Sequence, residues 1–149
     1  MNPDDGKWSI EPVLQLVFDG REDEALSAIG PELGKSAADE LRFLTASVDA
    51  SGARDVERRG RVRLANLYTL SEFLMDKECW AEAVTALDWT IKLSEDMNEF
   101  FFLENARFGK ALCHKMLGQP IAMLKEKQRV SADKTFFIGG KVLGVGDLD

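Results

Sequence analysis

Residues able to carry out chemistry are few in this chain. Histidine occurs once, as His114, so neither a histidine-dependent catalytic triad nor a multi-histidine metal site can form within one chain. Cys79 and Cys113 each lie in an apolar helical pattern, where a thiol acts as a small hydrophobic group in a reducing cytosol. The sequences CxxC, HExxH, GxSxG and the phosphate-binding loop are missing. We therefore predict no enzyme activity, no catalytic residue, no metal and no cofactor.

Carboxylates are the one reactive group present in number. The chain has 26 Asp and Glu against 19 Lys and Arg, a formal net charge of −7. Five of these acids gather where two predicted helices meet: Asp88, Glu95, Asp96, Glu99 and Glu104. Such a group could be a solvated face, a contact for a basic partner, or an acid–base pair, and the sequence leaves all three open. The negative charge disfavours direct binding of nucleic acid, whose affinity comes largely from cationic contacts to phosphate.

Trp89 is the most informative single residue. In the helix predicted over 80–94, it lies opposite the stripe that faces the core, which consists of Trp80, Val84, Leu87 and Ile91. Either this helix is sandwiched between helical hairpins, or Trp89 is partly exposed beside Asp88 as the aromatic anchor of an acidic interface. In the second case the partner-binding residues are Asp88, Trp89, Glu95, Asp96, Glu99 and Glu104.

Helical periodicity runs through most of the sequence. With 45% hydrophobic and 30% charged residues, the composition fits one soluble domain over residues 1–149. Capping residues and apolar spacing predict helices at about 8–18, 21–30, 36–50, 54–76, 79–95, 99–117 and 120–130. The helix over 54–76 is the strongest, with one stripe formed by Leu64, Leu67, Tyr68, Ser71, Leu74 and Met75. The helix over 99–117 is expected to bury Phe101, Phe102, Phe108, Leu112, Cys113 and Met116.

A change of period marks the C-terminal tail. Residues 1–134 are predicted to be helical, and residues 135–149 to form two very short strands about Gly139 and Gly140. An isolated hairpin is only marginally stable, so the tail must pack on the helices. The residues expected to make that contact are Phe136, Phe137, Ile138, Val142 and Leu143.

A helix–break–helix pattern recurs three times, as FDGREDEAL (18–26), MDKECWAEAV (75–84) and LGQPIAML (117–124). The segment WAEAVTALDWTIKL resembles the start of the second helix of a tetratricopeptide repeat, although no full consensus repeat is present. The predicted fold class is therefore mainly all-α: stacked, tetratricopeptide-like helical hairpins with a short C-terminal β-hairpin or extended tail.

The N-terminal residues and the hydropathy predict the cellular location of the protein. MNPDDGKW carries acids where a secretory signal has basic residues, and no run approaches 18 apolar residues. We expect a cytoplasmic protein that makes no membrane contact.

The last third of the chain resembles a family of small bacterial immunity proteins. The similarity lies in NEFFFLENARFGKALCHKMLGQPIAMLKEKQRV and the following SADKTFFIGGKVLGVGDL. That family serves contact-dependent growth inhibition and related polymorphic toxin systems. The resemblance implies an antitoxin that binds a cognate toxin domain, often a nuclease such as a tRNase, and protects the producing bacterium. The acidic charge would suit a basic toxin, bound as a 1:1 complex with a monomer. The alternative is a tetratricopeptide-like adaptor or secretion chaperone.

Overall fold

The computed structural model describes residues 10–19, 21, 24–25, 27–28, 56–138 and 140–149. Within these ranges the protein is mainly helical and ends in a two-stranded antiparallel hairpin, as the sequence predicts. The helices are α1 (Ile10–Phe18), α4 (Val56–Asp76), α5 (Trp80–Met97), α6 (Leu103–Met116) and α7 (Pro120–Lys127). The strands are β1 (Thr135–Ile138) and β2 (Lys141–Gly144), followed by the 3-10 turn η1 (Val145–Leu148). The helix predicted over 36–50 lies outside the described residues.

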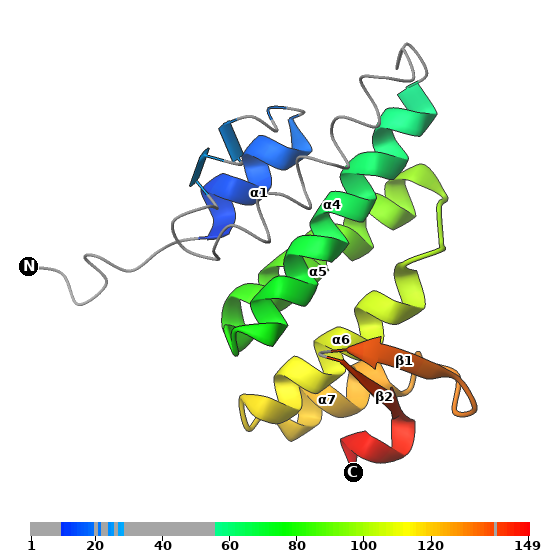
Figure 1. Ribbon diagram of the computed structural model, residues 1–149. Coiled ribbons are helices and arrows are strands. Elements are labelled where there is room, and N and C mark those ends of the chain that lie inside the picture. The colour runs from blue at the N-terminus through cyan, green and yellow to red at the C-terminus, as the bar shows by residue number, and fades with distance from the viewer. Residues whose placement is uncertain (1–9, 20, 22–23, 26, 29–55, 139) are drawn as a thin grey trace, which may run out of the picture.

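Each helix from α4 to α6 packs against the next one along the chain (Figure 1). The helix α1 lies against both α4 and α5, whereas α7, the hairpin and η1 gather around α6. The stripe predicted on α4 is buried throughout, from Leu64 to Met75. On α5, the buried Ala83 and Ala86 are small, so this helix can approach its neighbours closely.

The helices α4, α5 and α6 all end in the same way. A residue with left-handed backbone follows each helix, namely Glu78 (φ 60°), Asn98 (φ 53°) and Gly118 (φ 71°). In each case its N–H donates to the carbonyl three residues earlier, and the next N–H donates to the carbonyl five residues earlier. This is the Schellman motif, which satisfies the last carbonyls of a helix and reverses the chain. The three helices therefore share one C-terminal geometry, although only α6 uses glycine for it.

The hairpin packs on α6 through its inner face. Phe136 stacks on the fully buried Phe108, with ring centroids 4.4 Å apart and planes 15° from parallel. Ile138 is also buried, and Leu143, the partner of Phe136 across the hairpin, is partly buried. Successive side chains of a strand point to opposite faces, so the paired Phe137 and Val142 face outward, 64% and 67% exposed. The prediction that these two residues contact the helices was wrong.

Two residues assigned to the buried face of the α6 region are also exposed. Phe101 is 76% exposed, because it lies in the turn before α6, where its ring makes a T-shaped contact with that of Phe102. Met116 is 51% exposed, because it is the last residue of α6, where the helix runs out of the core. The other predicted members of this face are buried or partly buried: Phe102, Phe108, Leu112 and Cys113.

Candidate partner-binding surface

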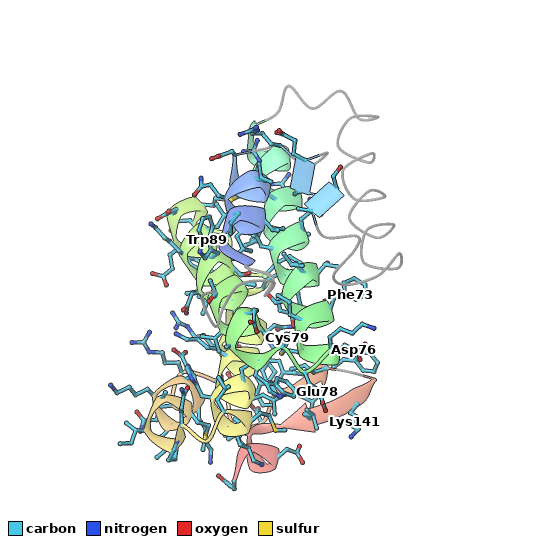
Figure 2. The ribbon with its side chains drawn as sticks, turned by 90° about the vertical axis from the view of Figure 1, so that its left-hand side faces the viewer. Phe73, Asp76, Glu78, Cys79, Trp89 and Lys141 are labelled. Atoms are coloured by element: carbon cyan, nitrogen blue, oxygen red, sulfur yellow. The ribbon has the colours of Figure 1, made fainter. Side chains whose placement is uncertain are left out.

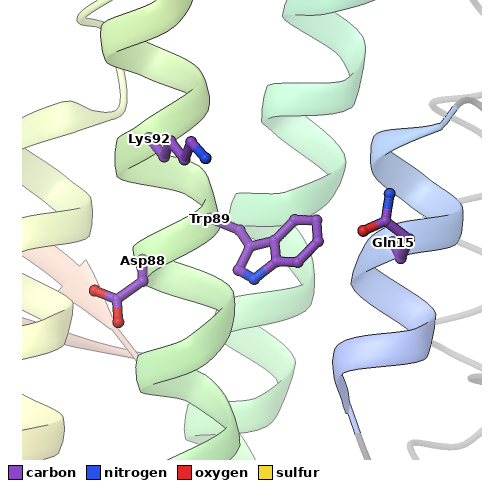
Figure 3. A pocket seen from close by; sticks show the side chains of 4 residues that line it. All are labelled: Gln15, Asp88, Trp89 and Lys92. Carbon is purple, nitrogen blue, oxygen red and sulfur yellow. The ribbon is translucent and has the colours of Figure 1, made fainter.

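Trp89 lies between α5 and α1 at the molecular surface. Its ring extends from α5 toward Gln15 of α1 (Figure 3). The side chain is partly buried and packs against the core cluster. It also helps line a surface pocket of about 460 Å³, formed by Gln15, Asp88, Trp89 and Lys92. The position agrees with the sandwiched interpretation while leaving part of the aromatic ring accessible to a ligand or partner.

This pocket is remote from the hairpin and from the α4–α5 turn. Figure 2 shows Trp89 well along α5 from Glu78 and Cys79, and farther still from Lys141 of β2. The exposed Asp96 follows Trp89 by seven residues, which places both on one side of α5. We call this side of α5, which presents part of the Trp89 ring and the Asp96 carboxylate to solvent, the outward face of α5.

Asp88 and Glu95 belong to an ion-pair network that joins three helices. Asp88 Oδ1 lies 2.7 Å from Lys110 Nζ, and Glu95 Oε1 lies 3.3 Å from Arg107 Nη2. Both cations also contact Glu126 of α7, at 3.1 Å from Lys110 and 3.4 Å from Arg107. Two predicted interface carboxylates are thus engaged inside the chain, which reduces the negative charge they can offer a partner.

Lys110 stays charged within this network. Its burial opposes the ammonium form, but the hydrogen bonds to Asp88 and Glu126, together with the negative charges of these two groups, outweigh that effect and raise the pKa of Lys110. Glu126 is only 12% exposed. It was not singled out from the sequence, because its partners are brought to it by a different helix, α6.

Glu104 lies apart from this network and faces the segment between α7 and β1. Its carboxylate accepts a hydrogen bond from the backbone N–H of Ser131 and another, 3.2 Å long, from Lys134 Nζ. Hydrogen bonds from Ser131, and then from Lys134, hold the pKa of Glu104 below its usual value. Glu104 therefore fastens this segment to the start of α6.

The structure thus separates the six predicted partner-binding residues. Four of them lie on α5, namely Asp88, Trp89, Glu95 and Asp96. Glu99 follows in the connection between α5 and α6, and Glu104 lies in the first turn of α6. Neither Asp96 nor Glu99 makes a side-chain ion pair with the residues that the structure describes. Trp89 and Asp96 are the members best placed for a partner, and binding by all six stays a prediction.

Exposed hydrophobic side chains form a second set, which was not predicted from the sequence. In the described ranges, the large ones all lie between residues 100 and 142: Phe100, Phe101, Met116, Leu117, Ile121, Leu124, Phe137 and Val142. The sequence contains a feature that could have predicted this exposure. Residues 121–124 are four consecutive apolar residues, and one buried helix face cannot accommodate all of them. The helix α7 has no buried residue.

Cys79 immediately precedes α5, and Cys113 and His114 lie on α6. Burial raises the pKa of the Cys113 thiol to about 12, and burial together with Glu82 raises that of Cys79. His114 Nδ1 lies 2.7 Å from Gln119 Oε1 across the α6–α7 turn. Over the described part of the chain, no three His, Cys, Asp or Glu residues are arranged to hold a metal ion. Among the helices described, none has the length and apolar character needed to cross a membrane.

Comparison of the chain with protein-family models, curated proteins and solved structures gives no match.

Proposed function

We propose that this protein is an immunity protein that binds a cognate toxin domain and neutralises it, with the outward face of α5 as the contact surface. The single observation that carries the proposal is the position of Trp89, partly covered by α1 and lining a pocket on an acidic helix. Tryptophan is among the residues that most often dominate the binding energy of an interface. The resemblance of residues 98–148 to immunity proteins supplies the class of partner.

The charge of the chain supports a basic toxin, such as a nuclease. The net charge is −7, and Asp96 stands exposed on the same side of α5 as Trp89. Opposite charges across an interface speed association and select the correct partner. Asp88 is a poorer probe than Asp96, because its removal would leave Lys110 with one carboxylate instead of two.

The test is co-expression with the C-terminal domain of the protein encoded by the neighbouring upstream gene, used as the candidate toxin. It is scored by survival and by co-purification. The wild-type chain should rescue growth and form a 1:1 complex. Trp89→Ala should weaken the complex by roughly tenfold or more, and Asp96→Lys by about threefold to tenfold. Circular dichroism should show unchanged helical content for both.

A matched control shows whether Asp96→Lys weakens the complex through its position on α5 or only through the change in net charge. Asp133→Lys makes the same charge reversal at an exposed position between α7 and β1, and it should leave the affinity within about twofold. Failure of the wild-type chain to rescue or to bind would refute the immunity function and leave the adaptor or chaperone alternative. Equal weakening by Asp96→Lys and Asp133→Lys would refute α5 as the contact surface.

A further inference from the structure

The end of α6, the turn after it and α7 carry four exposed aliphatic side chains within residues 116–124. Met116 and Leu117 precede Gly118, and Ile121 and Leu124 follow it. Ile121 is 72% exposed, and it lies three residues before Leu124 on one ridge of α7. We call these four residues the α6–α7 patch. Large exposed apolar patches mark binding sites, whereas apolar side chains scattered singly over a surface do not.

The charge available around the α6–α7 patch is positive, in contrast to the chain as a whole. Lys125 and Arg129 are exposed and make no ion pair within the described residues, and Lys115 donates only to the backbone carbonyl of Asp147. The one carboxylate of α7, Glu126, points inward to Arg107 and Lys110.

The nearby C-terminal acids are also engaged. The carboxylate of Asp147 accepts a hydrogen bond 2.7 Å long from the backbone N–H of Gly144, and Asp149 pairs with Lys127. The cations at this surface are therefore opposed by few unengaged carboxylates.

We infer that the α6–α7 patch is a second binding surface, whose occupant is an acidic, apolar polypeptide segment of a partner protein. Aliphatic side chains of the segment would cover Ile121 and Leu124, while its carboxylates would meet Lys125 and Arg129. This surface is separate from Trp89, and the inference does not depend on a basic toxin.

Charge favours a polypeptide over an anionic bilayer. A short acidic segment meets only the cations within a Debye length, about 8–10 Å under physiological conditions. A bilayer is an extended negative plane that also meets the rest of a chain of net charge −7. A second copy of this chain is disfavoured in a symmetric pairing, because the same cations would face one another.

The test uses a library of displayed random peptides of about 15 residues, a length that can form a helix on binding. The library is selected on the wild-type protein and counter-selected on the double variant Ile121→Ser with Leu124→Ser. Because α7 has no buried residue, this variant should keep its fold, as circular dichroism will report. Enriched peptides should combine apolar residues with an excess of Asp and Glu. Their affinity should fall roughly tenfold in the double variant and about threefold in Lys125→Glu.

The matched control removes two other exposed apolar side chains, at a different place on the surface. Phe137→Ser with Val142→Ser alters the outer face of the hairpin and should leave peptide affinity within about twofold. Enrichment of basic or uncharged peptides, or of none, would overturn the inference. So would binding of the wild type to phosphatidylglycerol vesicles in place of acidic peptides, or a wild-type dimer that the Ile121/Leu124 variant abolishes.

Discussion

The neighbouring helices α6 and α7 are held in the molecule by different forces. The helix α6 inserts Phe108, Ala111 and Cys113 fully into the core. The helix α7 has no buried residue and is attached through the partly buried Met123 and the contacts of Glu126 with Arg107 and Lys110. Apolar burial therefore fixes α6, whereas ion pairs and partial burial fix α7. The difference separates the part of the chain that makes the fold from a part that can present a surface.

Truncating the core side chain of α6 should have the largest effect. Phe108→Ala removes a fully buried ring that also supports Phe136, and it should lower the free energy of unfolding by about 3–5 kcal/mol. Ile121→Ala on α7 should change that free energy by no more than about 0.5 kcal/mol. Urea unfolding followed by circular dichroism measures both. Equal losses from the two substitutions would show that α7 is as deeply packed as α6.

Removing the shared carboxylate of α7 should have an intermediate effect. Glu126→Gln keeps the shape of the side chain but leaves Lys110 and Arg107 without their common anion, so stability should fall by roughly 1–3 kcal/mol. Because the groups are partly exposed, the loss should shrink in high salt. The control Asp133→Asn, at an exposed position, should be neutral. An unchanged stability in Glu126→Gln would mean that the ion pairs do not attach α7.

At neutral pH the smallest effect is that of Tyr68, because its ionisation changes the stability only in alkali. Burial, and then Glu72, raises the pKa of Tyr68 to about 12, whereas a hydrogen bond with Asn105 acts the other way. Since the unfolded value is about 10, the contribution of Tyr68 to stability should be constant below pH 10 and fall as the pH rises toward 12. Tyr68 is the only tyrosine, so phenolate absorbance reports it alone. A midpoint near 10 in the folded protein would show that its ring is hydrated, and the protein in denaturant gives the reference.

Regular periodicity made much of the core predictable. On α4, the spacing of Leu64, Leu67 and Leu74 could belong only to a helix with one buried face, and all three are buried. In the tail, the alternating pattern predicted two strands at the place where β1 and β2 occur. Local spacing sufficed in both cases, because the burial of each residue follows from its neighbours along the chain.

The other structural features depend on contacts between elements, which the spacing of residues along the chain does not encode. Phe101 and Met116 have the composition of core residues, but they stand where a helix begins or ends, and their exposure is set by the point at which α6 leaves its neighbours. The network of Glu126 joins residues from three helices. The turns at Glu78 and Asn98 adopt the left-handed conformation without glycine, the residue by which such turns are usually recognised.

Because α7 has no buried residue, its sequence can tolerate many substitutions during evolution. Substitutions at Ile121, Leu124 and Lys125 alter the surface without opening a cavity, so most of them leave the chain above the stability threshold that selection enforces. The inward Glu126 keeps the helix attached while its outward face varies. A lineage carrying this fold can thus explore new partners through α7 while the core of α4, α5 and α6 remains unaltered.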